Sequence, residues 1–236
     1  GTDLQKMGRG APSGKFVPGR EMGSGGSPPS SEAARQKLRE ALDFEELDEG
    51  RYRLRTVILD KRERTVSFPM KVHMREGAVE YAVVIEGGKT HESIFTTEAD
   101  PSDVHLACLL LGMSEFFACK WPADCESIPE RRSVVAEVRW ATNGPERRVP
   151  LEDLILRREA DGSDGRQRSL ERGPWFYSGS NFHGGSFAAG REGSIVSIIG
   201  DDAALLNGLR RGHHDDLLHT PNRDKLPRQG RRVMLV

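Results

Sequence analysis

Residues 87–112 read GGKTHESIFTTEADPSDVHLACLLLG, a stretch that predicts a turn, a strand and a capped helix in succession. The two glycines at its start form the turn, and the run KTHESIFTT resumes extended structure. Asp100 suits the N-cap of a helix, Pro101 suits the first helical position, and Gly112 suits the end. We therefore expect a helix over residues 101–112.

Apolar side chains cover nearly all of the surface of this predicted helix. They are Val104, Leu106, Ala107, Cys108, Leu109, Leu110 and Leu111. A helix with so little polar surface is expected to be buried against a sheet. Asp103 occupies the third helical position, where a carboxylate favours the positive end of the helix.

Alternating apolar and polar residues predict strands on both sides of this helix in the sequence. The runs that read as strands are residues 51–58, 65–72, 79–85, 134–140, 147–149, 175–177, 186–189, 193–199 and 232–236. The first two runs form a hairpin, and Asn143-Gly144 closes a second one. Pro69 marks an edge or a bulge, whereas the run 79–85 is apolar on both faces and is expected to be central.

These elements predict an α+β domain of mainly antiparallel sheet, either a sandwich or an incomplete barrel. Short helices are expected near residues 32–42, 150–156 and 201–206, besides the buried helix. Residues 1–31 have the Gly, Ser and Pro content of a flexible leader, and residues 32–49 form a short helix and a linker. Residues 50–236 then make a single domain.

Charge and hydropathy exclude two classes of protein. Lys and Arg are in excess at both ends of the chain, so the central part is acidic and lacks the basic surface that nucleic acid requires. No apolar run is long enough to cross a bilayer, so no transmembrane segment is expected. The chain starts with Gly1 rather than Met, so a signal segment could precede this residue in the natural protein.

Three cysteines, Cys108, Cys119 and Cys125, form no CxxC pair, so the sequence supports neither a zinc ribbon nor an iron–sulfur cluster. Cys119 and Cys125 could form a disulfide across a short loop, but nothing in the sequence demands it. Cys108 lies on an apolar helix face and is expected to be a small buried residue. We predict no cofactor, and Zn²⁺ is the alternative.

Three runs together resemble the YdjY-type domain of bacterial envelope proteins. They are GGKTHESIFTTEADPSDVHLACLLLG at 87–112, REGSIVSIIGDDAALLN at 191–207 and the terminal LPRQGRRVMLV. The resemblance covers roughly residues 50–236 and implies an exported or lipid-anchored protein of the periplasm or cell envelope, in a family without an established activity. It also singles out Lys89, His91, Glu92, Ser93, Pro101, His105, Gly112, Arg191, Glu192 and Gly193.

Two interpretations of the polar residues in this set differ in chemistry. His91, His105 and nearby carboxylates could hold Zn²⁺ in a metal-dependent hydrolase, although their spacing matches no zinc signature. Strand alternation would also place Glu92 on the opposite face from His91. Ser93 with His105 as base lacks the GxSxG turn of a serine hydrolase. The other interpretation makes His91 and His105 buried, hydrogen-bonded structural groups.

We therefore expect a non-catalytic envelope domain that binds a protein partner or a small ligand, with the metal-dependent enzyme as the alternative. The loop with His213, His214, Asp215, Asp216 and His219 is expected to be solvated, since no rigid element fixes these side chains. The aromatic residues of 175–187 are expected to belong to the core rather than to a ligand groove.

Overall fold

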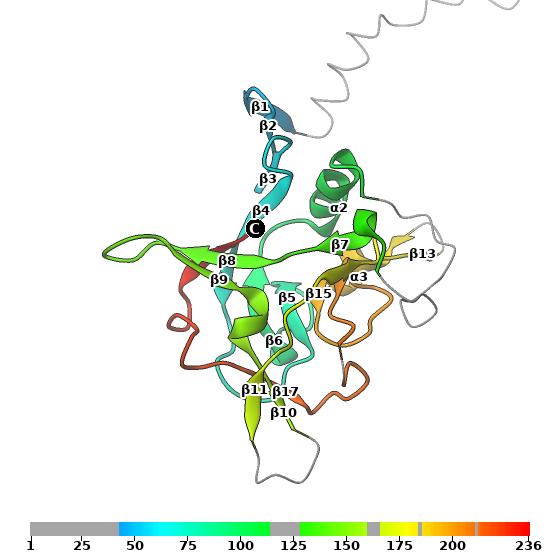
Figure 1. Cartoon of the computed structure of the whole chain (residues 1–236). Coiled ribbons are helices and arrows are strands. Elements are labelled where there is room, and N and C mark those ends of the chain that lie inside the picture. The colour runs from blue at the N-terminus through cyan, green and yellow to red at the C-terminus, as the bar shows by residue number, and fades with distance from the viewer. Residues whose placement is uncertain (1–42, 114–127, 160–165, 184–185, 211) are drawn as a thin grey trace, which may run out of the picture. The chain divides into compact units, whose positions relative to one another are not determined.

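A large β-sheet organises the fold in the computed structural model (Figure 1), which describes residues 43–113, 128–159, 166–183, 186–210 and 212–236. Ten of its strands follow one path of neighbours, in the order β1, β2, β3, β4, β6, β5, β15, β16, β12 and β7. Their bounds in that order are Phe44–Asp48, Arg51–Leu54, Val57–Asp60, Thr65–Val72, Ser93–Thr97, Tyr81–Ile85, Ser194–Ser197, Leu206–Asn207, Trp175–Tyr177 and Ser133–Val134.

A branch of the sheet leaves the path at β4. It consists of three strands, β18 (Arg232–Leu235), β8 (Glu137–Trp140) and β9 (Arg147–Pro150). β18 pairs with β4 and with β8, and β8 also pairs with β9. Two smaller sheets contain β11 (Gln167–Ser169), β10 (Ile155–Arg158) and β17 (His219–Pro221), and β13 (Phe182–His183) with β14 (Ser186–Phe187). Because all described pairs except β5–β6 and β15–β16 are antiparallel, the predicted α+β class with mainly antiparallel sheet is confirmed.

The centre of the sheet is the parallel pair β5 and β6. All five residues of β6 are buried, and so are four of the five residues of β5. Each of these strands has a neighbour on either side, and apolar side chains therefore fill both faces. The central position predicted for the run 79–85 is confirmed.

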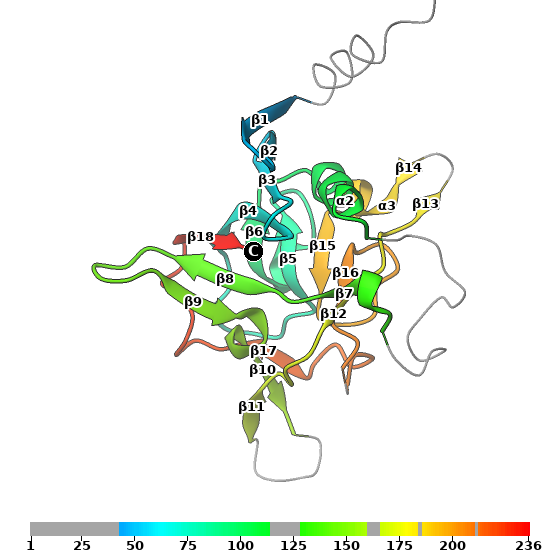
Figure 2. The same ribbon diagram turned by 45° about the horizontal axis from the view of Figure 1, so that its top comes forward.

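One extended stretch of chain, residues 133–140, contains both β7 and β8. β7 pairs with β12, whereas β8 pairs with β18 and β9, and the intervening Val135 and Ala136 belong to no ladder. Figure 2 shows β18 between β4 and β8, and it is antiparallel to both. The described strands thus form an incomplete barrel whose wall is interrupted beside Val135.

Helix α2 (Pro101–Leu110) begins as the sequence predicts. The Asp100 carboxylate accepts a hydrogen bond from the Ser102 amide at 2.8 Å, and Pro101 occupies the first turn. The helix packs against β3, β4 and the short helix α3 (Ala188–Glu192). Leu110, with 43% exposure, faces solvent. Within the described residues, no helix has the length and apolarity needed to span a membrane.

Several predicted boundaries differ from the structure. The run 51–58 contains two strands, because Arg55 adopts a left-handed conformation (φ 50) and turns β2 back into β3. Residues 150–156 form the short 3-10 helix η4 (Leu151–Leu154), followed directly by β10. The run 186–189 is mostly helix α3 rather than strand. The predicted helix over 32–42 and the leader lie outside the described residues.

Residues 201–206, all of which the structure describes, do not form the helix that the sequence predicts. Asp201 accepts from the Ala203 amide through its side chain at 2.9 Å and from the Ala204 amide through its carbonyl, which makes a single turn. Leu206 and Asn207 then pair with β15 and β12. Strand pairing therefore prevails over the local helix signal.

Pro69 pairs with Met234 of β18 on one side of β4, but on the other side the pairs with β3 end at Ser67 and those with β6 begin at Lys71, so Pro69 lies at a local edge, as predicted. Proline is tolerated because its nitrogen faces this gap, where no ladder bond requires a backbone donor. The Thr97 hydroxyl donates to the Pro69 carbonyl at 2.6 Å, and the backbone ladder between β4 and β6 is confined to Lys71 and Val72.

Candidate functional site

The residues singled out by the sequence lie in two separate parts of the domain. Lys89, Arg191 and Glu192 come together where the turn after β5 meets the end of α3. His91 and Glu92 lie beside them in the 3-10 helix η1 (Thr90–Glu92). Ser93 and His105 are buried elsewhere, in β6 and α2. The set is therefore not one site.

Lys89 is bound to a buried tyrosine. Its Nζ donates to the Tyr81 hydroxyl at 2.6 Å, and that hydroxyl donates to the Asp201 carboxylate at 2.9 Å. Burial and the neighbouring Asp201 charge raise the pKa of the Tyr81 phenol, so it stays protonated at neutral pH. This chain of hydrogen bonds links β5, the turn after it and the 201 loop, and no group in it is left reactive.

Glu192 reaches the same ammonium group from α3. Its carboxylate lies 3.8 Å from Lys89 Nζ and 3.0 Å from the Arg191 guanidinium. The close approach depends on Gly193, which ends α3 at φ 74, and where a Cβ would lie 2.6 Å from Ile85 Cγ1 and 3.0 Å from Gly88 Cα. Glycine is thus required at the contact between the two segments.

His91 is not buried, contrary to one interpretation of the sequence. Its side chain is 79% exposed and its Nε2 lies 3.6 Å from the carboxylate of Glu92, the adjacent residue. The reason is that residues 90–92 form a turn of 3-10 helix, so the strand begins only at Ser93. The predicted alternation of His91 and Glu92 across a strand therefore does not occur.

His105 and Ser93 are enclosed by the core. His105 Nδ1 lies 2.8 Å from the Tyr177 hydroxyl, and its ring also packs on Phe187 with centroids 5.1 Å apart. The Ser93 hydroxyl donates to the Phe95 carbonyl at 3.0 Å. Within the described residues, no three His, Cys, Asp or Glu side chains are grouped so that they could hold a metal ion.

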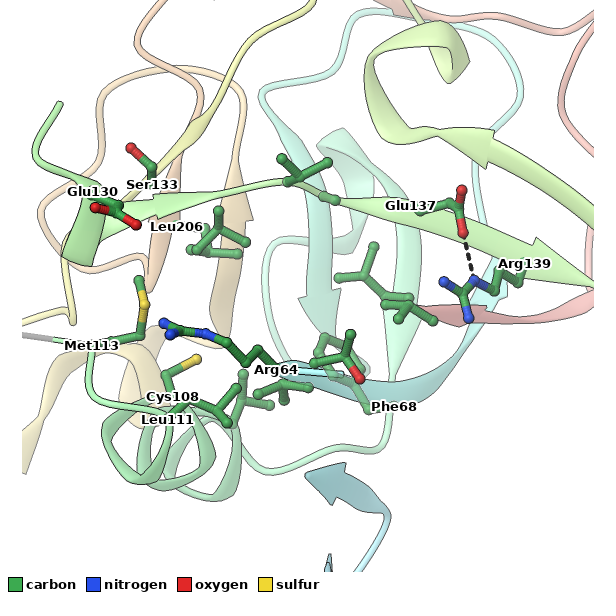
Figure 3. A pocket seen from close by; sticks show the side chains of 18 residues that line it. Arg64, Phe68, Cys108, Leu111, Met113, Glu130, Ser133, Glu137, Arg139 and Leu206 are labelled. Carbon is green, nitrogen blue, oxygen red and sulfur yellow. Dashed lines mark hydrogen bonds and ion pairs between the residues drawn. The ribbon is translucent and has the colours of Figure 1, made fainter. Parts of the chain in front are cut away.

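A pocket of about 430 Å³ opens between α2, the start of β4 and the β7–β8 stretch (Figure 3). Its lining is mainly apolar and comes from residues distant in the sequence. The apolar lining residues are Val66, Phe68, Val104, Cys108, Leu111, Met113, Val134, Val135, Ala136, Leu206, Leu235 and Val236. A volume of this size is within the range of small-ligand sites in proteins.

Charged side chains lie at the two ends of the pocket. At one end, Arg139 Nε donates to Glu137 at 2.5 Å, so this pair is internally neutralised. At the other, Arg64 reaches across the pocket from the turn before β4, and Glu130 approaches from η3 (Glu130–Arg132) (Figure 3). Neither the Arg64 nor the Glu130 side chain makes a hydrogen bond or ion pair with another residue in the described ranges.

The pocket offers little chemistry beyond binding. Burial raises the pKa of the Cys108 thiol to about 12, so the nucleophilic thiolate is scarce at neutral pH. The Ser133 hydroxyl donates to the carbonyls of Ile128 and Pro129. The lining residues that the structure describes include no histidine or aspartate. The arrangement therefore suits recognition of an apolar group.

Sequence reasoning did not find this pocket. Its lining comes from the turn before β4, from α2, from the 133–137 stretch and from β16 and β18, and no motif joins them. One weak signal was present: Val134 and Val135 are consecutive apolar residues, which breaks the alternation of a strand with one exposed face. Val135 is 80% exposed.

Comparison with known proteins identifies one family. The model of the YdjY domain matches residues 57–236, a range that contains every lining residue of the pocket and every residue that the sequence singled out. Searches of the curated proteins and of the solved structures found no match. The match confirms the resemblance seen in the three sequence runs. The chain therefore belongs to the YdjY domain family.

Proposed function

We propose that this domain is a non-catalytic binding module and that the pocket beside α2 is its binding site. The observation that carries the proposal is the combination of a mainly apolar cavity of about 430 Å³ with Arg64 and Glu130, two unpartnered charges of the described chain, at its mouth. Such a cavity would bury the apolar part of a ligand and keep its polar end near solvent.

The alternative, a hydrolase that uses His91 and His105, has less support. His91 is exposed beside Glu92, while His105 is packed under Tyr177 and Phe187. A catalytic pair must approach a common reacting atom, and these side chains belong to different environments.

We extend the proposal to location, because the resemblance places relatives of this kind in the bacterial envelope. Immunoblotting of fractionated cells of the source organism would check it. A periplasmic or membrane-associated signal is expected, and a purely cytosolic one would contradict it.

Binding of anilinonaphthalene sulfonate, a fluorescent probe with an apolar body and an anionic end, tests the proposed site. We expect saturable binding with one probe per chain. Leu111→Trp should fill the pocket and weaken probe binding about tenfold or more, because Leu111 lines it. Leu110→Trp is the matched control, since the adjacent Leu110 faces solvent and lies outside the lining.

The urea midpoints of both variants should stay close to that of the wild-type protein, which checks that the probe is not reporting a loosened core. Failure of the wild-type protein to bind the probe would contradict the proposal. Equal binding by the two Trp variants would contradict it as well.

A further inference from the structure

We propose that the turn at residues 228–231 and the start of β18 form a binding site for a phosphate group. The site borders a hollow of about 550 Å³, called the arginine hollow below. Its described lining consists of Ala141, Arg228, Gln229, Gly230, Arg231 and Arg232. None of these residues lines the pocket beside α2, so the site is independent of the proposed function.

A β-turn brings two of the arginines together. The Arg231 N–H donates to the Arg228 carbonyl at 3.1 Å, and Gly230 has a φ of 78, the conformation of the third residue in a type II turn. The Cα atoms at the two ends of such a turn lie less than about 7 Å apart. The run RQGR at 228–231 therefore holds Arg228 and Arg231 side by side, with glycine where the turn requires it.

The body of the domain holds this turn in place. The Gly230 N–H donates to the Val72 carbonyl at 2.8 Å, and the Val72 N–H donates to the Arg231 carbonyl at 3.0 Å. Both bonds attach the turn to β4, in the large sheet. The Arg231 guanidinium also donates to the Ala141 carbonyl at 2.7 Å. The two arginines are thus carried by a fixed segment, as a specific site requires.

The arginine hollow lies where β18 and β8 separate. Toward the start of β18, the last pair between these strands is Met234 with Arg139. If the ladder continued in the same register, Arg232 would lie opposite Ala141. The Ala141 carbonyl instead accepts from the Arg231 side chain, and the space between the two segments is left open.

The Arg232 N–H faces this open space. Val236 exchanges backbone hydrogen bonds with Glu137, so the even-numbered residues of β18 direct their backbone groups toward β8. The N–H and carbonyl of Arg232 have no backbone partner among the described residues. The N–H adds a donor for an anion, and the carbonyl suits a hydroxyl group beside it. The Arg232 side chain shares a face with Lys71, its cross-strand partner, so only its backbone is assigned to the site.

No carboxylate of the described chain neutralises the two turn arginines. The Arg228 and Arg231 side chains form no ion pair with a described residue, and the described lining contains no aspartate or glutamate. Elsewhere, the exposed Arg148 and Arg172 pair with carboxylates at 3.0 and 2.9 Å. Two guanidinium groups held close together repel each other, and an anion between them relieves the repulsion. The local charge therefore favours an anionic ligand.

A phosphate ester matches these donors in geometry and in charge. A guanidinium donates through parallel N–H groups, a fork that fits two oxygens of one phosphate. A phosphomonoester has three such oxygens and a charge of about −2, which suffices for two arginines and the Arg232 N–H together. The hollow also has room for the organic group of the ester. Soluble phosphate esters and phospholipid headgroups share this chemistry.

Titration with glycerol 3-phosphate at an ionic strength of about 0.15 M tests the site through amide shifts in nuclear magnetic resonance spectra. We expect saturable binding of one molecule per chain, with a large shift of the Arg232 amide. Arg228→Gln should weaken binding about tenfold or more. Arg158→Gln is the matched control, because Arg158 is exposed on β10, lacks an ion pair to any described residue and lies outside the hollow. It should bind like the wild-type protein.

Arg228→Lys separates a phosphate site from general attraction by positive charge, because lysine keeps the charge and loses the fork. Binding should be at least about threefold weaker in this variant. Wild-type affinity in Arg228→Lys would overturn the proposal, and so would equal affinities in Arg228→Gln and Arg158→Gln. Amide spectra that match the wild type outside residues 228–232 would show that each variant is folded.

Vesicles of phosphatidylcholine, with and without phosphatidic acid, identify the source of the phosphate. Sedimentation of the protein only with phosphatidic acid, lost in Arg228→Gln and retained in Arg158→Gln, would assign a phospholipid headgroup. Binding of glycerol 3-phosphate without sedimentation would assign a soluble ester. Sedimentation that persists in Arg228→Gln, or no saturable binding in either experiment, would overturn the proposal. Neither result would alter the expected probe binding at the pocket beside α2.

Discussion

The cluster around Glu152 and the pocket beside α2 differ in whether their polar groups already have partners. The Glu152 carboxylate accepts from Trp175 Nε1 at 3.0 Å and from Arg210 at 2.7 Å, and both charged side chains are nearly fully buried. At the mouth of the pocket, Arg64 is exposed without an ion pair to any described residue.

The comparison distinguishes the polar groups that stabilise the fold from those that are available to bind a partner. A buried polar group costs folding free energy unless it is paired, so pairing inside the core is a condition of stability. A polar group at an accessible edge can be hydrated instead, and it keeps its bonding capacity for a partner. Unpaired groups at a pocket mouth are therefore better guides to binding than paired residues in the core.

The largest effect is expected from breaking the Glu152 cluster. Glu152→Ala leaves Arg210 buried without its counter-ion and Trp175 without its acceptor, which should lower the free energy of unfolding by about 3–5 kcal/mol. Urea denaturation measures the loss. Glu146→Ala is the control, because its pair with Arg148 is half exposed and should change the free energy of unfolding by less than ~1 kcal/mol.

Equal losses in the two variants would show that the buried cluster carries no special stability. Probe binding in Glu152→Ala should match that of the wild-type protein below the unfolding transition, since Glu152 does not line the pocket. A loss of probe binding without unfolding would contradict the separation between the two regions.

A smaller effect is expected from the buried His219 at acid pH. His219 is 1% exposed, and burial together with the Arg157 charge lowers the pKa of its imidazole to about 4. In the unfolded chain the imidazole takes up a proton near pH 6.5, so the unfolded state binds more protons between these values. Stability is therefore full above pH 6.5 and is lost as pH falls toward 4, by up to about 3 kcal/mol.

Denaturation curves at several pH values would measure this dependence. In His219→Gln the slope of unfolding free energy against pH should be smaller than in the wild-type protein over that window. His91→Gln is the matched control, because His91 is exposed and its replacement should leave the slope unchanged. A wild-type slope retained in His219→Gln would contradict the assignment.

The expectation that the whole 213–219 loop is solvated is wrong at His219, which pairs within β17.

Local signals in the sequence were sufficient for the segments whose structure is determined locally. The start of α2 was predicted because Asp100 and Pro101 satisfy the helix terminus without help from elsewhere. The hairpin at Asn143-Gly144 was predicted for the same reason. The Asp201 turn was missed because strand pairing of Leu206 and Asn207 overrides the helix signal.

The pocket could not be predicted, because its lining comes from segments that are far apart in the sequence. The run 134–140 reads as one strand, and its division at Val135 depends on the pairing of β7 with β12 and of β8 with β18. Arg64 gives no local signal, since whether an arginine is paired depends on the fold. His91 and His105 were misleading in the opposite way. In the sequence they resemble a catalytic or metal-binding pair, but in the structure they lie in unrelated environments.

The smallest effect on stability is expected at Arg64, for which Arg55 is a matched control. Both arginines occupy hairpin turns with nearly the same left-handed φ, 55 and 50. Arg55 pairs with Asp100 at 2.9 Å and with the buried Asp103 at 2.8 Å, whereas Arg64 has no such partner in the described chain.

Arg55→Ala should therefore lower the free energy of unfolding by about 1–3 kcal/mol, because burial already raises the pKa of Asp103 and its carboxylate would lose the neighbouring charge. Arg64→Ala should change it by less than ~0.5 kcal/mol. Binding of anilinonaphthalene sulfonate should show the reverse order, with about threefold weaker binding in Arg64→Ala and none of this loss in Arg55→Ala. If Arg64→Ala destabilised the fold as much as Arg55→Ala and left probe binding intact, the mouth of the pocket would be a structural feature, and unpaired charge would not mark recognition at this pocket.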